Sequence, residues 1–341
     1  MNSTSHYPVL GASGVKASRL WLGTMMFGNQ TGTEEAERII EGARAAGINA
    51  IDTADVYASG ASERMVGELI AGDRERWVLA TKAANPTGDG PNDRGLSRRH
   101  LLRAVDASLG RLRTDWIDIL YLHRDDETVP VEETVSTLAT LIDRGRVHYF
   151  GVSNFRAWRV ARIVEVCRRM GVPQPIVCQP PYNAMTRGIE TELLPCCAHY
   201  GLAAVVYSPL ARGVLSGKYL PDAAIPEGTR AARGDKRLLE TELRTESLEL
   251  AKRMSEYAMR RGTTVQQLAL AWVWNNRAVH GLIAGPRTFE QWQQYLDALN
   301  VVFTEEDEEF VSNLVPAGHA STPGYTDPAY PVTGRIPRTA S

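Results

Sequence analysis

Short runs of apolar, often β-branched residues recur along the chain, and a segment of helical periodicity or a charged loop follows each run. The eight runs are residues 20–22, 50–52, 77–81, 117–122, 147–152, 176–178, 203–207 and 279–284. Helical periodicity is clearest in residues 34–46, 98–111, 131–144, 158–170 and 246–261. Runs that are apolar on both faces and alternate with helices predict a parallel sheet whose two faces are both covered.

Eight parallel strands can close into a barrel, whereas an open doubly wound sheet would carry a glycine-rich phosphate turn after its first strand. No G-x-G-x-x-G sequence occurs in the chain. The predicted fold class is therefore α/β, a (β/α)8 TIM barrel. Residues 8–17 precede the first strand and predict a small N-terminal β-hairpin that caps the barrel floor. The connections 82–116 and 208–279 are unusually long, the second following the seventh strand, and such loops build the sites of barrels.

The 341 residues fit one barrel domain, with a core over about 10–315 and an irregular tail, 316–341, that either hangs loose or covers the barrel mouth. Hydrophobic residues make up 43% and charged residues 23%, which allows a large core and excludes disordered, collagenous and coiled-coil classes. With 38 basic and 40 acidic residues, the formal charge of -2 favours a small-molecule partner over nucleic acid or an anionic membrane.

The four cysteines, Cys167, Cys178, Cys196 and Cys197, lack the spacing of a zinc site and indicate a reducing compartment. The seven histidines include no H-x-H or H-E-x-x-H arrangement, so we expect no metal centre. No apolar run approaches the length of a spanning helix, and the first twelve residues do not resemble a secretion signal. A cytoplasmic protein is expected.

Ionisable or phenolic side chains stand where three neighbouring strands end. Asp52 ends the second strand, Tyr57 follows in its loop, Lys82 ends the third, and His123 ends the fourth. One such residue is usually a cap or an ion-pair partner. Four of them at the carboxyl ends of adjacent barrel strands indicate a catalytic site, because barrel enzymes build their chemistry there.

Several motifs together resemble the aldo-keto reductase family, over about residues 10–310. They are Asp52-Thr53-Ala54-Asp55-Val56-Tyr57, Lys82, Leu122-His123, Gly151-Val152-Ser153-Asn154-Phe155, Gln179, the run from Tyr207 to Gly213, Gly217-Lys218-Tyr219 and Gly285-Pro286-Arg287-Thr288. The resemblance implies that Asp52, Tyr57, Lys82 and His123 form a tetrad that reduces a small carbonyl compound with NADPH, or oxidises an alcohol with NADP. It also implies a single barrel domain.

The chemistry of these four side chains agrees with that role. Hydride transfer to a carbonyl carbon leaves an alkoxide that needs a proton donor, and Tyr57 can supply the proton. An ammonium at about 4 Å is worth roughly 4 kcal/mol at an effective dielectric of about 20, so Lys82 is expected to bring the pKa of Tyr57 towards neutrality. Asp52 is the natural counter-ion of the buried Lys82, and neutral His123 would polarise the carbonyl oxygen.

The cofactor phosphates are expected in the loops after the seventh and eighth strands, where barrels usually bind phosphate. These loops contain Ser208, Leu210, Arg212, Gly213, Lys218, Gly285, Arg287 and Thr288. The guanidinium of Arg287 suits a 2′-phosphate and so favours NADPH over NADH. Thr288 and Gln291 have the spacing of a helix capping box.

The resemblance assigns further contacts. It implies that Ser153, Asn154 and Gln179 bind the nicotinamide carboxamide, that Tyr207 stacks on the ring, that Gly23, Thr24 and Met25 border the ribose, and that Gln291 and Tyr295 lie near the adenine. It also implies that Asp52 contacts the cofactor. Two positions depart from the family pattern. Ala58 follows Tyr57 where many relatives have glycine, which predicts an altered loop path, and Tyr295 stands where relatives often carry asparagine.

Two other functions fit parts of the pattern. A barrel aldolase could form a Schiff base through Lys82, since a strand-end lysine near a tyrosine serves that chemistry. The family also contains channel-associated subunits that bind NADPH and act as redox-sensing regulatory partners, and the tetrad is compatible with that role.

Overall fold

The computed structural model describes residues 7–331, and its centre is a closed barrel of eight parallel strands. Each strand pairs with its neighbours in chain order, and the eighth pairs with the first. The strands are β1 (Leu20–Gly23), β2 (Ala50–Asp52), β3 (Val78–Ala83), β4 (Ile117–Leu122), β5 (Val147–Ser153), β6 (Val177–Gln179), β7 (Ala203–Val206) and β8 (Gly281–Ala284). The predicted fold class, a (β/α)8 barrel, is confirmed.

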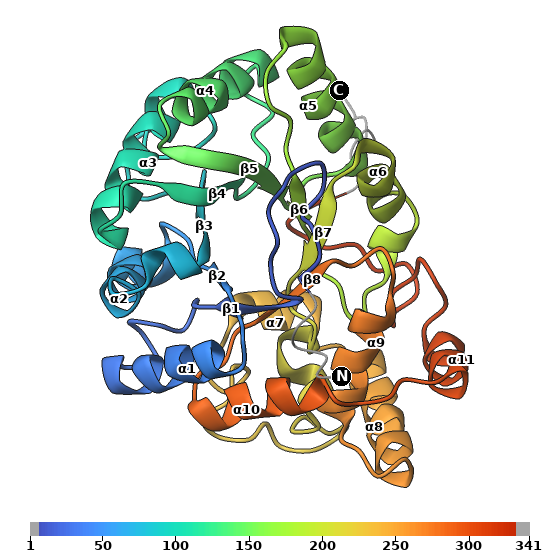
Figure 1. Cartoon of the computed structure of the whole chain (residues 1–341). Helices are drawn as coiled ribbons and strands as arrows, with labels where there is room; N and C mark the ends of the chain where they lie inside the picture. The colour runs from blue at the N-terminus through green and yellow to red at the C-terminus, as the bar shows by residue number, and fades with distance from the viewer. Residues whose placement is uncertain (1–6, 332–341) are drawn as a thin grey trace, which may run out of the picture.

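Helices surround the barrel on its outer side (Figure 1). They are α1 (Thr33–Ala45), α2 (Ala61–Leu69), α3 (Arg98–Leu112), α4 (Val131–Asp143), α5 (Ala157–Met170), α6 (Leu193–Tyr200), α7 (Lys236–Thr241), α8 (Thr245–Arg260), α9 (Val265–Asn275), α10 (Phe289–Ala298) and α11 (Glu305–Leu314). The long connection after β7 holds α7, α8 and α9, and only residues 217–235 of it form an extended loop.

Alternation along the strands divides the apolar residues between two cores. In β4, Ile119 and Tyr121 belong to a cluster inside the barrel, whereas Leu120 and Leu122 belong to the layer beneath the helices. Leu10 and Ala17 of the N-terminal segment join the inner cluster. This packing explains why the strands read apolar on both faces.

The predicted N-terminal hairpin is present and lies at the amino ends of the strands. Val9 and Lys16 form an antiparallel bridge, and the Leu10 N–H donates to the Val15 carbonyl at 2.9 Å. The Ala12 N–H donates to the carbonyl of Gly201, just before β7, at 2.9 Å. In Figure 1 this dark-blue segment crosses the middle of the barrel. The carboxyl ends of the strands lie on the opposite side.

The tail from residue 316 to 331 packs on the barrel's helices and loops, and residues 332–341 lie outside the described residues. Ala320 bridges Thr186 in the connection after β6. Further on, the carboxylate of Asp327 pairs with Arg237 at 2.6 Å, and the Arg244 guanidinium lies 3.8 Å from the ring centroid of Tyr325. The described tail is therefore anchored along its length.

Candidate active site

Lys82 is the centre of a buried polar cluster at the carboxyl ends of β2 and β3. Its Nζ donates to Asp52 Oδ1 at 2.5 Å, to the Thr53 carbonyl at 2.8 Å and to the Tyr57 hydroxyl at 3.2 Å. The Lys82 side chain is 1% exposed and that of Asp52 4%. Strand β3 continues through Ala83, one residue beyond the predicted end at Lys82, so the ladder itself fixes the direction of Lys82.

The ammonium of Lys82 keeps its charge in this environment. Burial lowers the pKa of Lys82, but the carboxylate of Asp52 and the oxygen of Tyr57 raise it, and the net pKa lies above its ordinary value. Gln179 Nε2 donates to the second oxygen of Asp52 at 2.7 Å, which holds the carboxylate in place. The three ammonium hydrogens thus have three acceptors, one of which is Tyr57.

The pKa of Tyr57 differs from the expectation. Burial raises it, and although Lys82 lowers it, the net pKa stays above the ordinary value for tyrosine. The expectation assumed an ammonium acting in a fairly polar medium, whereas here desolvation of the phenolate is the larger effect. Tyr57 therefore remains protonated at neutral pH in this structure.

His123 is neutral and faces Tyr57. Burial, together with the neighbouring cations Lys82 and Arg124, lowers its pKa to about 3. Its ring meets that of Tyr57 edge-on, with centroids 6.0 Å apart and planes at 84°. His123 Nδ1 is buried without a hydrogen-bond partner among the described residues. A neutral imidazole beside a phenol can present an N–H to a carbonyl oxygen held between them.

The loop after Tyr57 adopts left-handed backbone conformations. Ala58 has φ 49° and Ser59 φ 53°, followed by Gly60 at φ 83°. This region favours glycine, so Ala58 occupies a glycine-like conformation at a steric cost. The loop reaches α2 through this turn. Alanine at position 58, where glycine is expected in many relatives, adds backbone strain, whereas the sequence predicted an altered loop path.

One cavity of about 550 Å³ collects almost all the residues that the sequence singled out. Those that line it are Gly23, Thr24, Met25, Asp52, Tyr57, His123, Ser153, Asn154, Gln179, Tyr207, Ser208, Leu210, Arg212, Gly213, Lys218, Gly285, Arg287, Gln291 and Tyr295. Lys82 acts on the cavity through Tyr57, and Thr288 caps α10 beside it by accepting from the Gln291 N–H. The lining residues belong to elements spread along most of the chain, from β1 to α10.

A hydrogen-bonded chain links His123 to Tyr207 across the cavity wall. The Tyr207 hydroxyl donates to Asn154 Oδ1 at 2.7 Å, and Asn154 Nδ2 donates to the His123 carbonyl at 2.9 Å and to Ser153 Oγ at 3.0 Å. Ser153 Oγ donates in turn to the Gln179 carbonyl at 2.9 Å. The amide and hydroxyl groups of this wall are therefore held in fixed orientations.

Cations gather on the cavity side formed by the loops after β7 and β8. Arg212, Lys218, Arg230 and Arg287 all line the cavity. Burial lowers the pKa of Lys218, and Arg287, Arg230 and Arg233 lower it further by repulsion. Asp235 lies 3.8 Å from Arg230. A cluster in which cations repel one another is suited to an anion that carries several charges.

Several lining residues were not predicted, namely Pro209, Ser216, Arg230, Gln266, Leu270, Ile283 and Gln294. Gln294 lies three residues after Gln291 on the same helix, so helical spacing could have found it. Arg230 lies in the loop 217–235, where no periodic pattern places it.

The predicted capping box at the start of α10 is only half formed. Thr288 Oγ1 accepts from the Gln291 N–H at 3.3 Å, as the motif requires. Gln291 Oε1, however, accepts from the Arg287 N–H at 2.8 Å instead of from Thr288. The glutamine side chain thereby fixes the backbone of Arg287 at the cavity.

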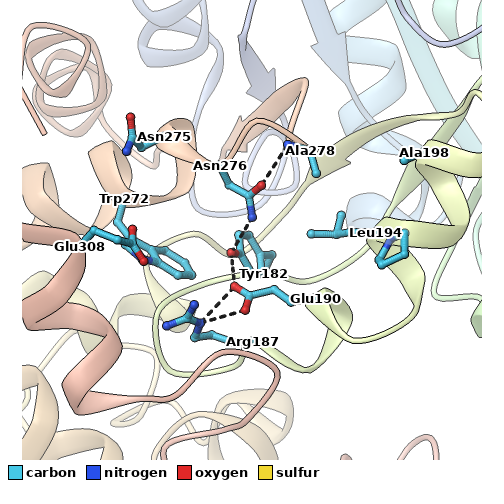
Figure 2. Close-up of a pocket in the computed structure, with 11 residues that line it drawn as sticks. Tyr182, Arg187, Glu190, Leu194, Ala198, Trp272, Asn275, Asn276, Ala278 and Glu308 are labelled. Atoms are coloured by element: carbon cyan, nitrogen blue, oxygen red, sulfur yellow. Dashed lines mark hydrogen bonds and ion pairs between the residues drawn. The ribbon is translucent and has the colours of Figure 1, made fainter. Parts of the chain in front are cut away.

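A second cavity, of about 490 Å³, lies between α6, α9 and α11 outside the barrel (Figure 2). Its polar side chains satisfy one another. Tyr182 donates to Glu190 at 2.5 Å and accepts from Asn276 at 3.0 Å, and Arg187 pairs with Glu190 at 3.0 Å. We interpret this network as structural, because its charged groups already have partners.

Across residues 7–331, no group of three or more histidine, cysteine or carboxylate side chains is arranged to hold a metal ion. Within the same range, no helix has both the length and the apolar character needed to cross a membrane. All four cysteines are free thiols.

Comparison with known proteins places this geometry in a sequence family. A model of the Aldo/keto reductase family matches residues 19–314, which contain all eight strands and the helices through α11. The rice (Oryza sativa subsp. japonica) protein named probable voltage-gated potassium channel subunit beta is 35% identical over 325 residues, covering 94% of this chain and 99% of the rice protein.

Two other relatives cover the chain to a similar extent. The Arabidopsis thaliana protein of the same name is 38% identical over 301 residues, covering 87% of this chain and 92% of its own. The Bacillus subtilis (strain 168) protein named uncharacterized oxidoreductase YrpG is 35% identical over 331 residues, covering 93% of this chain and 98% of its own.

Proposed function

The chain belongs to the aldo/keto reductase family, and from that premise we propose that it uses NADPH to reduce an aldehyde or ketone to the alcohol, reversibly with NADP. One observation carries the proposal. A single cavity of about 550 Å³ holds both a half-buried phenol paired with a buried ammonium and a cluster of four cations. The first suits proton donation to a reduced carbonyl, and the second suits the phosphates of a dinucleotide.

The cavity fits the chemical groups of NADPH. When bound, NADPH would supply the hydride that the carbonyl carbon accepts. Arg212, Lys218, Arg230 and Arg287 would hold the phosphates, because an anion relieves their mutual repulsion in this half-buried cluster. Ser153, Asn154 and Gln179 would orient the carboxamide, Tyr207 would cover the nicotinamide ring, Gly23, Thr24 and Met25 would border the ribose, and Gln291 and Tyr295 would lie at the adenine.

The tetrad would then complete the reduction. His123, neutral across the physiological range, would donate an N–H to the carbonyl oxygen and stabilise the charge that develops there. Tyr57 would give its proton to the same oxygen as the alcohol forms. Lys82 would stabilise the resulting tyrosinate at 3.2 Å, and Asp52 would keep Lys82 charged.

The names of the two plant relatives support a second function. A potassium channel beta subunit of this family could bind NADPH with the same residues and act as a redox-sensing partner of a channel. The Schiff-base alternative is weakened by the pairing of Lys82 with Asp52, which favours the charged ammonium over the neutral amine that attacks a carbonyl.

A cofactor-consumption assay tests the proposal. Purified protein is mixed with NADPH and a panel of aldehydes and ketones, and with NADP and the matching alcohols, while NADPH binding is measured by fluorescence. We expect binding together with turnover of part of the panel. Binding without any turnover would support the regulatory function, and absence of NADPH binding would contradict both.

A further inference from the structure

Two further buried carboxylates, Asp55 and Glu63, lie behind the tetrad. Asp55 is 3% exposed and Glu63, on α2, is fully buried. Glu63 accepts from Thr81 Oγ1 at 2.6 Å and from Arg111 Nε at 2.6 Å. Both oxygens of Asp55 are buried and have no hydrogen-bond partner among the described residues. The guanidinium of Arg111 therefore lies near both carboxylates, and it donates its hydrogen bond to Glu63 rather than to Asp55.

This cluster is in direct contact with the catalytic elements. The Asp55 N–H donates to the Lys82 carbonyl at 3.2 Å, and Thr81 precedes Lys82 on β3. Arg111 packs against the loop after Tyr57, because a Cβ built on Gly60 would lie 2.7 Å from Arg111 Cδ. The Lys82 ammonium that supports Tyr57 also lowers the pKa of Asp55, so the two charges interact.

Asp55 is the group in this cluster that can change its charge near neutral pH. The net pKa of Asp55 is about 7, because burial raises it most and the Glu63 carboxylate on α2 raises it too. Arg111 on α3, the backbone amide of Val56 and Lys82 on β3 act in the opposite direction. No step of the proposed reduction uses this carboxyl.

We propose that Asp55 is a positioning residue which, by taking up or releasing a proton, sets how strongly Lys82 supports Tyr57 as the acid of the reaction. This inference rests on the proposed reductase function. When Asp55 is neutral, the positive charge of Lys82 acts on Tyr57 undiminished. When Asp55 is ionised, its charge opposes that of Lys82 and makes Tyr57 a weaker acid. The proton that Asp55 exchanges goes to solvent and enters no bond of the substrate.

The consequence is a partial loss of reductase rate as the pH rises through neutrality, before Tyr57 itself ionises. A change of about one pKa unit in Tyr57 corresponds to roughly three- to tenfold in rate. The Kd of NADPH should not follow this loss, because Asp55 does not line the cofactor cavity.

The test measures kcat for carbonyl reduction, with NADPH saturating, from about pH 5 to about pH 9.5. We expect wild type to lose roughly three- to tenfold around neutral pH and Asp55→Asn to keep the low-pH rate across that range. Glu63→Gln should shift the loss to lower pH, because it removes the neighbouring negative charge and frees Arg111 to pair with Asp55. Asp106→Asn, at an exposed carboxyl of α3, is the matched control and should behave as wild type.

A profile of Asp55→Asn parallel to that of wild type would overturn the inference while leaving the reductase function standing. A uniform loss of rate at every pH would assign Asp55 a structural role instead, which also overturns it. The pH dependence of Tm provides a check without turnover: the gain in Tm of Asp55→Asn over wild type should grow as the pH rises from about 4 to about 7 and stay constant above that. An equal gain at every pH would show that Asp55 does not titrate. If wild type reduces no carbonyl, the proposed function fails, and this inference fails with it.

Discussion

Tyr57 holds its proton because burial outweighs the nearby ammonium, and that is a useful state for a proton donor. An alkoxide is a far stronger base than a tyrosinate, so a phenol with a raised pKa still transfers its proton once hydride has reached the carbonyl carbon. The ammonium of Lys82 then matters most after the transfer, when it faces a buried negative oxygen at 3.2 Å. The arrangement of Lys82 and Tyr57 therefore stabilises the tyrosinate that the proton transfer leaves behind.

This division of roles predicts the behaviour of Tyr57→Phe. The variant keeps the ring and loses only the hydroxyl, so the Kd for NADPH should stay within about twofold while kcat for reduction falls by about 10²–10⁴-fold, the usual contribution of a positioned acid. Fluorescence titration and steady-state kinetics measure the two quantities. Full activity in this variant would exclude Tyr57 as the donor.

Lys82→Met serves as the companion variant. It should also suppress turnover, and it should move the alkaline limb of any residual activity upward, because the pKa of Tyr57 rises when the charge is removed. A Schiff-base enzyme would instead form a borohydride-trapped adduct with its substrate that Lys82→Met abolishes and Tyr57→Phe retains.

At the scale of elements, the turn between β2 and α2 carries backbone strain next to the acid. Ala58 at φ 49° is the position where many relatives are expected to have glycine. Ala58→Gly relieves a left-handed conformation at a cost in unfolded-chain entropy, so we expect the free energy of unfolding to rise by up to about 1 kcal/mol. Denaturant titration measures it.

The control for this variant is Ala61→Gly, at ordinary helical angles of φ -68° and ψ -31°. Glycine there should lower the stability by about 0.5–1 kcal/mol. Equal destabilisation by both substitutions would mean that the strain at Ala58 is not significant.

The sequence predicted the elements where one local signal decides the structure. The strands followed from apolar runs, and the tetrad followed from polar residues at their ends. The apolar run stops at Thr81 because a lysine interrupts it, but burial against Asp52 lets the strand continue through Lys82 to Ala83, one residue beyond the predicted end. Arg230 was missed for a different reason: long-range packing of the loop 217–235 brings it to the cavity, and no periodic pattern records such packing.

The loops after β7 and β8 predict how the cofactor is selected. Arg287→Ala should weaken NADPH by roughly ten- to a hundredfold, because a charge-assisted contact to a phosphate is worth about 1.5–3 kcal/mol. NADH lacks the 2′-phosphate and should change little. Lys236→Ala, at an exposed cation of α7 that does not line the cavity, is the control. Equal losses of affinity for NADPH and NADH in Arg287→Ala would show that Arg287 does not recognise the 2′-phosphate.

At the scale of the whole molecule, the C-terminal tail returns to the catalytic end of the barrel. The Arg156 guanidinium, just before α5, donates to the Pro331 carbonyl at 2.7 Å. Burial raises the pKa of Tyr207 in the cavity wall, and Tyr330 of the tail raises it further. Burial also raises the pKa of Tyr330, while Arg124, the residue after His123, lowers it. Tyr330 therefore lies close to groups at the cavity. The tail was expected either to hang loose or to cover the barrel mouth. Its described part borders the mouth on the side of β4, β5 and β7.

Deletion of residues 322–341 should therefore act on the substrate more than on the cofactor. The cations that would hold the phosphates belong to the loops after β7 and β8, so the Kd of NADPH should stay within about threefold, whereas KM for the carbonyl should rise roughly tenfold as the wall near Tyr207 opens. The Thr186–Ala320 bridge remains in the shortened chain, which keeps the preceding anchor. Kinetics with small and bulky carbonyls would measure the effect.

Asp327→Asn is the conservative counterpart of the deletion. Its ion pair with Arg237 is partly exposed, at 26% and 34%, so the pair contributes less than about 1 kcal/mol and its loss alone should leave the tail in place. The deletion should thus change KM and the point substitution should not. Unchanged KM in both would show that the tail lies beside the opening without forming part of it, and the substrate would then be selected by the loops 84–97 and 217–235.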